Sequence, residues 1–372
     1  MSCVIRHRRY LHQHPELSME EYNTSKYCKA FLKELGYQIK EIWHTGFVAE
    51  LNLNKSRTIA FRAEMDGLPV QEETGYQYCS INEGVSHACG HDAHMAIILN
   101  LGERIIKNKT NINNNIKLLF QPSEEMFPGG AVSMINHGAL KNVDEIYGLH
   151  NNPQIHTGKI KCPLGNVTAN CDILECSIIG ECGHAASPHS ALDPISITTN
   201  LINQIQFLPI KYINPMHNVL INITNVNSGN NAVGVIPNSA SFKGIIRTFN
   251  EQDRVLIKKK ISQLILATEL QGYQTNLHIK QGYPSIYNKK YGHDRVIKAV
   301  EKMKSVTIEN NSNPELWGED FSYYLNYIDG AFFILGSGYS NTVNAPLHSS
   351  KYKLDENCLE LGVDIFYQIA LE

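Results

Sequence analysis

The stretches TIAFRAEM (residues 58–65), AHMAIILNLGERIIK (93–107) and IKLLFQ (116–121) decide the fold class of this chain. The first and third are apolar runs of strand length, and the second carries apolar residues at helical spacing. A short helix at 130–138 and a strand at 145–150 continue the alternation. Strands that alternate with helices predict an α/β sheet with helices on its faces.

The middle of the chain has a different pattern. Four stretches read as strands and two as helices, which together predict a four-stranded sheet with one open face: strands at 172–179, 218–226, 240–248 and 275–281, and helices at 194–208 and 251–272. The α/β pattern returns with a strand at 331–338 and a helix near 356–371. We therefore expect a discontinuous catalytic domain (1–170 and 283–372) with an α+β domain inserted at 171–282.

Composition narrows the class of protein. The chain has 372 residues, with 33 Lys and Arg against 36 Asp and Glu, for a net charge of −3. This balance gives no electrostatic support for nucleic-acid binding. No apolar run reaches the roughly 18–20 residues that span a bilayer, and the N-terminus lacks the apolar core of a secretory signal. Nine cysteines, an odd number, favour free thiols in a reducing compartment, and we expect a cytoplasmic protein.

The sharpest chemical motif is SHACGHDAHM at 86–95. A thiol at Cys89 and an imidazole at His91, just before a helix, can face one metal ion. The plainer interpretations are a buried thiol, a core histidine, and Asp92 as the N-cap of the helix.

A second motif, LFQPSEEMFPGG at 119–130, places Glu124 and Glu125 side by side after an apolar strand. Neighbouring carboxylates repel each other, so the pair suits a site that handles a cation and a proton. Consecutive strand side chains point to opposite faces, so one Glu can bind metal while the other acts as a base. The alternative is a solvated acidic turn.

Two further histidines complete the candidate set. His150 is predicted to end the strand at 145–150, and His348 lies in the Pro-containing loop NAPLHSSKY (344–352). With Cys89, His91 and Glu125 they make five candidate ligands, which is more than one tetrahedral ion takes and suits a dinuclear site.

Nine motifs occur in an order and spacing typical of a known family: HPELSMEE (14–21), FRAEMDGLP (61–69), HACGHDAHM (87–95), QPSEE (121–125), GLH (148–150), GHAASPH (183–189), GVIP (234–237), GEDF (318–321) and PLHSS (346–350). This set resembles the aminoacylase/carboxypeptidase-type dinuclear metallohydrolases. It is most similar to the amidohydrolase branch with hippurate hydrolases, N-acetyldiaminopimelate deacetylases and auxin-conjugate hydrolases. The resemblance implies a phosphorylase/hydrolase-like catalytic domain with a mixed sheet, and an inserted ferredoxin-like domain that serves as lid and dimerisation domain.

The resemblance also implies roles for individual residues. Cys89 would bridge two divalent ions, Zn or Mn first and Co or Ni as alternatives, with four further ligands: His91, Glu125, His150 and His348. Glu124 would be the general base, and Asp66 would orient a ligand. His184 would reach the scissile carbonyl from its own or a partner subunit of a homodimer, and Arg247 would bind the substrate carboxylate.

Four residues depart from the pattern of the branch. Glu64 stands in place of Asp, Gly234 in place of Asn, and Glu181-Cys182 in place of Lys-Gly. None is a predicted ligand, so these departures bear on substrate preference.

The expected reaction is metal-dependent hydrolysis of the amide bond of an N-acyl amino acid. A dipeptidase or carboxypeptidase with the same metals is the alternative within the enzyme class. A structural zinc-binding module is an alternative from another class, but it would give Glu124 no chemical role. A nucleophilic hydrolase would use Cys89 with a nearby histidine.

Overall fold

The computed structural model describes residues 2–229, 231–309 and 313–372 and divides into two compact units. The first comprises Met1–Val167, Ile286–Pro314 and Glu319–Glu372, and the second comprises Thr168–Ser285 and Glu315–Gly318. Among the described residues, no helix is both long enough and apolar enough to span a membrane.

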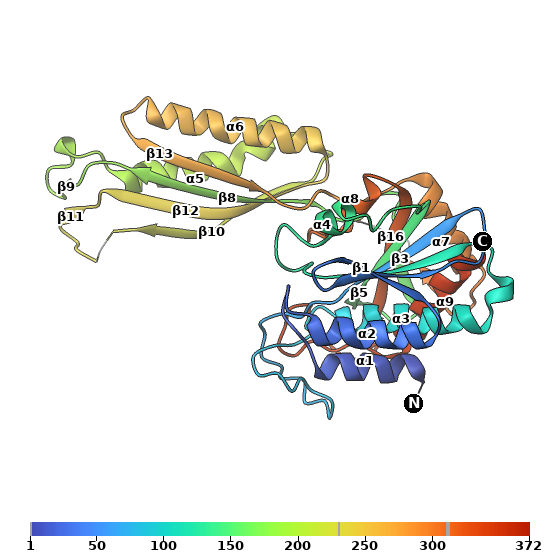
Figure 1. Cartoon of the computed structure of the whole chain (residues 1–372). Coiled ribbons are helices and arrows are strands. Elements are labelled where there is room, and N and C mark those ends of the chain that lie inside the picture. Colours follow the sequence, from blue (N-terminus) through green and yellow to red (C-terminus); the bar gives the residue numbers. More distant parts are fainter. Residues whose placement is uncertain (1, 230, 310–312) are drawn as a thin grey trace. The chain divides into compact units, whose positions relative to one another are not determined.

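The first unit is built on a mixed eight-stranded sheet (Figure 1). Its strands lie in the order β1 (Gln38–Trp43), β2 (Gly46–Leu51), β4 (Asn115–Gln121), β3 (Thr58–Glu64), β5 (Glu145–His156), β16 (Asp329–Gly338), β6 (Lys159–Lys161), β15 (Thr307–Ile308). The central strands from β4 to β16 run parallel, whereas β1, β2 and β4 pair antiparallel. The predicted strands at 58–65, 116–121 and 331–338 are confirmed.

Helices cover both faces of this sheet, with α2 and α3 on one face and α4 on the other (Figure 1). The helices of the unit are α1 (Cys3–Gln13), α2 (Tyr22–Glu34), α3 (His91–Lys107), η1 (Lys109–Asn111), α4 (Ala131–Asn136), α7 (Lys290–Glu301), α8 (Ser322–Leu325) and α9 (Asn357–Leu371). A small pair, β7 (Gly165–Asn166) and β14 (Tyr287–Asn288), lies beside them. Because α1, α2 and α9 pack around α3, most residues of α3 are buried.

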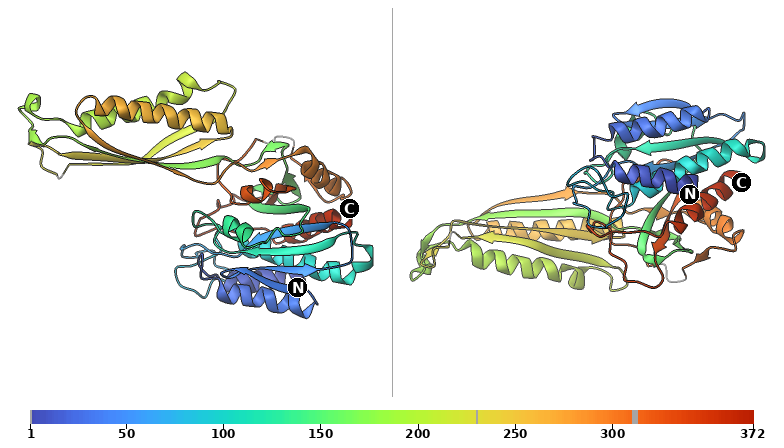
Figure 2. Two further views of the ribbon diagram at one scale, coloured as in Figure 1. Left: turned by 45° about the horizontal axis from the view of Figure 1, so that its top comes forward. Right: turned by 90° about the horizontal axis from the view of Figure 1, so that it is seen from below.

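The second unit has a four-stranded antiparallel sheet with both long helices on one face (Figures 1 and 2). Its strands lie in the order β10 (Val219–Ser228), β12 (Ser239–Thr248), β8 (Asn170–Ile179), β13 (Gln274–Gln281). The helices are α5 (Pro194–Tyr212) and α6 (Glu251–Glu269), and the smaller elements are β9 (Gly183–His184), β11 (Val235–Ile236) and η2 (Pro188–Ser190). Apolar residues alternate along β8 because only the helix-facing side is buried. The side chains of Asp193 and Asn250 cap α5 and α6.

Two details differ from the sequence expectations. Strand β5 continues to His156, so His150 lies inside a strand and not at its end. The N-cap of α3 is Gly90, so the plainer interpretation of Asp92 as the N-cap is wrong. Asp92 instead accepts a hydrogen bond from Arg8 Nε at 2.8 Å and lies 2.9 Å from His12 Nδ1, which ties α1 to the start of α3.

Candidate metal centre

Cys89 and His91 flank Gly90 in the turn that begins α3. Gly90 has a left-handed backbone (φ 86°), and a Cβ there would come within 2.2 Å of Asn151 Nδ2. That same Nδ2 donates to the carbonyl oxygen of Cys89 at 2.8 Å. Only glycine allows both the turn and this close contact. The motif therefore fixes the Cys89 backbone against β5, the strand that carries His150.

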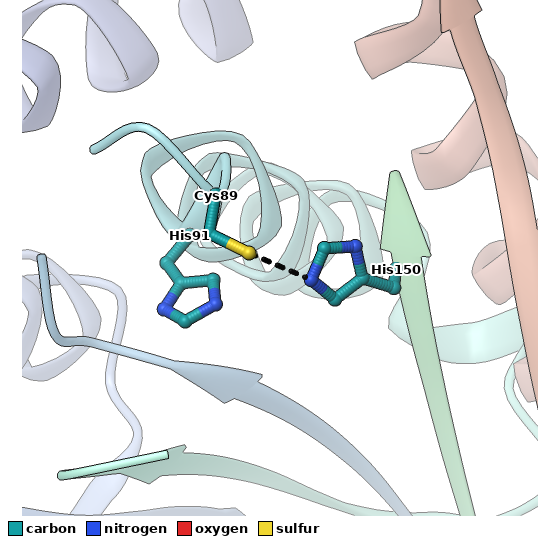
Figure 3. Close-up of side chains that lie close together, drawn as sticks. All are labelled: Cys89, His91 and His150. Carbon is teal, nitrogen blue, oxygen red and sulfur yellow. Dashed lines mark hydrogen bonds between the residues drawn. The ribbon is translucent and has the colours of Figure 1, made fainter. Parts of the chain in front are cut away.

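Cys89, His91 and His150 converge on one point (Figure 3). Cys89 Sγ lies 3.3 Å from His150 Nε2, and candidate ligand atoms of all three residues lie within 4.8 Å of one another. His150 Nδ1 lies 2.7 Å from the carbonyl oxygen of Asn151, which directs Nε2 towards the thiol. All three residues are buried. They form a compact group of one sulfur and two nitrogen donors.

His91 is oriented by Asp66. The Nδ1 of His91 lies 2.9 Å from the Asp66 carbonyl oxygen and 3.3 Å from its Oδ1, so Nε2 faces the site. Burial alone would raise the pKa of Asp66, but its hydrogen bond and charge interaction with His91 lower it to about 2. Burial lowers the pKa of His91, but Asp66 and the nearby carboxylates outweigh it and raise the value to about 10. A carboxylate behind a ligating imidazole is a common way to hold it in place.

Glu124 and Glu125 lie in the loop after β4, which ends at Gln121. The expectation that they are consecutive strand residues on opposite faces is wrong, because Ser123 has a left-handed backbone (φ 56°) and breaks the strand. The loop nevertheless brings both carboxylates to His91, since candidate ligand atoms of His91, Glu124 and Glu125 lie within 4.8 Å of one another.

His348 completes a second group. Its Nε2 lies 3.2 Å from Glu125 Oε1, and its backbone N–H donates to the carbonyl oxygen of Ala88 at 2.9 Å. Cys89, Glu125 and His348 form a candidate group of their own. The two groups share Cys89.

The chemistry of these donors fits divalent cations. His91 Nε2 is buried without a hydrogen-bond partner in the described part of the chain, and it lies 4.0 Å from Glu125 Oε1. Leaving a buried polar atom unsatisfied is costly, whereas a cation between these atoms would satisfy it. Thiolate, imidazole and carboxylate are the donors that zinc and related metals take.

Two histidines of the same motif have other surroundings. His94 Nδ1 lies 3.0 Å from Glu64 Oε2, and His94 Nε2 accepts the backbone N–H of Asn151 at 3.0 Å. Both ring nitrogens of His94 are thus engaged, although Glu64, His91 and His94 lie close enough to form a candidate group. His87 is buried, and its ring nitrogens have no hydrogen-bond partner among residues 2–229, 231–309 and 313–372.

A buried charge network beside Glu124 was not predicted from the sequence. Arg62 Nη2 donates to Glu319 Oε1 at 3.0 Å and to Asp320 Oδ1 at 2.6 Å, and Nη1 donates to Glu64. Gln121 bridges the guanidinium and Asp320. Two charged residues within the apolar run TIAFRAEM and the Glu-Asp pair of GEDF were the available signals.

This network sets the electrostatics of Glu124. Burial, followed by the charges of Glu319 and Glu125, raises the pKa of Glu124 well above its usual value. Burial, followed by the charges of Glu125 and Glu124, raises the pKa of the Cys89 thiol. The centre is rich in negative charge, so bound cations would favour ionisation of both groups.

Comparison with known proteins identifies the family. Residues 60–372 match the sequence profile of Peptidase family M20/M25/M40, which covers most of the chain. This chain belongs to that family.

Relatives within the M20 family match along almost the whole chain. N-acetyl-L-cysteine deacetylase of Bacillus subtilis (strain 168) is 34% identical over 369 residues, which cover 98% of this chain and 86% of that protein. Thermostable carboxypeptidase 1 of Saccharolobus solfataricus is 34% identical over 368 residues, covering 96% and 92%. A Bacillus subtilis crystal structure, described as a dinuclear metal-binding peptidase from the M20 family, matches with a TM-score of 0.85 and 28% identity, covering 99% and 96%. The resemblance inferred from the motifs is confirmed.

The other two residues expected in the M20 site belong to the second unit. His184 is exposed in β9, and its Nδ1 accepts the backbone N–H of Ala186 at 3.0 Å. Arg247 lies in β12, where Nε donates to the carbonyl oxygen of Leu316 at 3.0 Å. His184 is thus open to solvent, and Arg247 is bound to a backbone carbonyl oxygen of its own unit. The roles of both residues stay predictions.

Proposed function

We propose that this M20 protein is a metal-dependent amidohydrolase that cleaves N-acyl amino acids to a carboxylic acid and a free amino acid. The observation that carries the proposal is the pair of donor groups that share Cys89, with Glu124 beside them. A relative named N-acetyl-L-cysteine deacetylase, 34% identical over nearly the whole chain, supports the acyl class of substrate.

Two divalent ions per subunit, Zn or Mn with Co or Ni as alternatives, would be held by five residues: Cys89, His91, Glu125, His150 and His348. When bound, such ions lower the pKa of a water molecule and polarise an amide carbonyl. Asp66 would keep His91 in its ligating orientation.

The protein's own contribution to the reaction is proton transfer and charge placement. Glu124 would accept the proton of the attacking water and later give it to the leaving amine. Because its carboxyl group is buried, it would do so with little competition from bulk water. His184, from its own or the partner subunit, would donate to the negative charge that develops on the carbonyl oxygen.

Arg247 would bind the α-carboxylate of the substrate. Its Nε and Nη1 donate to the carbonyl oxygens of Leu316 and Ile246, at 3.0 and 3.3 Å. These bonds orient the guanidinium at one end of β12. A planar, permanently charged guanidinium suits recognition of a carboxylate.

The second unit would act as lid and as the dimerisation domain of a homodimer. Its strand order and its β-α-β-β-α-β succession are those of a ferredoxin-like fold. Strand β10 is an edge strand, and α5 carries the exposed apolar residues Phe207 and Ile210. An open strand edge and an apolar helix surface together support pairing with a second copy.

Free thiols support a reducing compartment. All nine cysteines lie among the described residues, and none is in a disulfide. A cytoplasmic location is accordingly part of the proposal.

A second candidate function is carboxypeptidase or dipeptidase activity at the same centre, because one relative is named thermostable carboxypeptidase 1. A cysteine nucleophile is disfavoured, since burial and then Glu125 raise the pKa of Cys89 and keep a metal-free thiol neutral.

The test is a hydrolysis screen of metal-reconstituted protein. N-acetyl, N-benzoyl and indole-acetyl amino acids would be compared with dipeptides of the same C-terminal residue. Higher kcat/KM for the acyl amino acids is expected. Faster cleavage of the dipeptides would favour the peptidase alternative, and full activity in verified metal-free protein would contradict both.

A further inference from the structure

Glu21 is a buried carboxylate that the chemistry above does not use. It stands just before α2, with a fully buried side chain. Oε1 accepts the backbone N–H of Met19 at 2.9 Å and that of Ser123 at 2.8 Å. Oε2 accepts the hydroxyl of Thr45 at 2.8 Å. One side chain therefore connects three segments that are distant in sequence.

The contact with Ser123 bears directly on Glu124. Ser123 has a left-handed backbone (φ 56°), which a residue with a side chain adopts only when its surroundings hold it there. Its N–H points to Glu21, and its carbonyl oxygen accepts the N–H of Gly130 at 2.9 Å. The residue that precedes Glu124 is thus held at both its N–H and its carbonyl oxygen.

The peptide that follows Glu124 is held in the same manner. The N–H of Glu125 donates to Asp66 Oδ2 at 2.9 Å, and the hydroxyl of Ser18 donates to the same oxygen at 2.7 Å. Two buried acidic side chains therefore accept hydrogen bonds from the residues on either side of Glu124: Glu21 from the Ser123 N–H and Asp66 from the Glu125 N–H. Ser18 and Glu21 come from one short segment before α2. This segment therefore contributes to both contacts, through Glu21 directly and through the Ser18 hydroxyl bound to Asp66.

We infer that Glu21 is a positioning residue for Glu124. By accepting the Ser123 N–H, Glu21 fixes the residue that precedes the base and so the position of the base itself. The inference rests on the proposed function, in which Glu124 moves the proton. Displacement of a catalytic group by about 1 Å can cost on the order of a hundredfold in rate. Loss of Glu21 should thus lower kcat, with KM and metal content unchanged, because Glu21 touches neither the candidate ligands nor the residues proposed to bind substrate.

Three substitutions at Glu21 separate this role from a structural one. Glu21→Ala removes the grip. Glu21→Asp keeps the acid but shortens it by one methylene group. Glu21→Gln keeps an acceptor oxygen for the two N–H groups, and the Thr45 hydroxyl can accept from its amide. Glu16→Ala is the matched control, because Glu16 lies in the same segment and its carboxylate accepts the N–H groups of Asn23 and Thr24 at the start of α2.

The experiment measures kcat, KM, bound metal and the absorption spectrum of the cobalt-substituted full-length proteins, with an N-acetyl amino acid that the wild type hydrolyses. We expect kcat to fall at least about tenfold in the Ala and Asp variants and to be restored in the Gln variant. Metal content and the cobalt spectrum should match the wild type in all of them. The Glu16→Ala protein should lose stability but keep its kcat.

A kcat for Glu21→Ala equal to that of Glu16→Ala would overturn the inference. If Glu21→Ala does not fold, Glu21→Asp and Glu21→Gln are compared instead. Equal kcat values in these two variants would overturn the inference. Glu124→Gln run in parallel separates the two claims. Full activity of Glu124→Gln would refute the proposed function, whereas an inactive Glu124→Gln beside a fully active Glu21→Ala would refute only the positioning role.

Discussion

Cys89 Sγ lies 3.3 Å from His150 Nε2, although 61 residues separate them in the chain. Burial, and then Glu125, raise the pKa of this thiol, so its ionisation depends on a nearby cation. Cys89→Ser should therefore lower the bound metal count, because a hydroxyl is a far poorer ligand than a thiolate. Elemental analysis after dialysis measures the number of metal ions bound per chain. Cys28→Ser is the control, since Cys28 is also fully buried but lies outside every candidate metal group of the described residues. Equal metal loss in both proteins would point to a general packing defect.

Substitution of Glu124 and of Glu125 by Gln should have different effects, the first on kcat and the second on metal binding. Glu124→Gln keeps size but removes the proton acceptor, so we expect normal metal content and a loss of roughly 10²–10⁴-fold in kcat. Glu125→Gln should weaken metal binding, because a neutral amide is a poor ligand, and added metal should recover part of its activity. Metal titrations and steady-state kinetics on the two variants provide the measurement. Metal loss in Glu124→Gln with none in Glu125→Gln would reverse the assignments.

Arg247→Ala should raise KM more than it lowers kcat, because a carboxylate clamp acts in ground and transition states alike. Esterification of the substrate carboxylate should then harm the wild type and barely affect the variant. Lys243→Ala is a control on the same strand, as Lys243 pairs with Glu175 at 3.1 Å. If esterification penalises the wild type and Arg247→Ala equally, Arg247 does not hold that carboxylate.

Mixed subunits test whether His184 acts across a dimer. His184→Ala and Glu124→Ala homodimers should each be inactive. Heterodimers that contain one of each would have a site with both groups intact, so partial activity should return after subunit exchange. Differently tagged chains purified in tandem allow the exchange to be verified. Verified heterodimers without activity would place His184 in its own subunit's site or outside catalysis.

Glu21 should make folding stability depend on pH. Burial, and then the charge of Asp66, raise its pKa from 4.5 to about 7. The folded chain therefore keeps a proton that the unfolded chain releases, so this contribution is full below pH 4.5 and is lost as the pH rises to 7. Glu21→Gln cannot ionise, and its stability relative to wild type should increase across that window by up to about 3 kcal/mol. Urea unfolding of the two chelator-treated proteins measures this, and parallel stability curves would contradict it.

The sequence allowed much of the first unit to be predicted. Segments such as 58–65 and 116–121 are apolar enough to be recognised as buried strands, and the 93–107 helix is nearly as long as α3. Helix α1 and strands β1 and β2 were not predicted. The burial of β1 is partial, and its Lys and Glu residues weaken the apolar signal.

The candidate centre could be predicted only where chemistry is local in sequence. Cys89 and His91 are two residues apart, so the sequence alone indicated that they could face one ion. Glu125 and His348 were predicted as separate candidate ligands, but their proximity depends on the whole topology and was not predicted. The strand expectation for Glu124 failed because Ser123 leaves the strand conformation. Glu21 was missed because its partner Ser123 lies 102 residues away.

The order of segments along the chain has a consequence for biosynthesis. Strand β16 fills the place beside β5 in the sheet, and His348 follows it near the end of the chain, after the complete second unit. On the ribosome, β5 therefore emerges long before its neighbour, and its edge is left open while residues 168–285 are made. We expect the second unit to fold during translation and the first to finish only after release, so that metal loading is the last step of maturation.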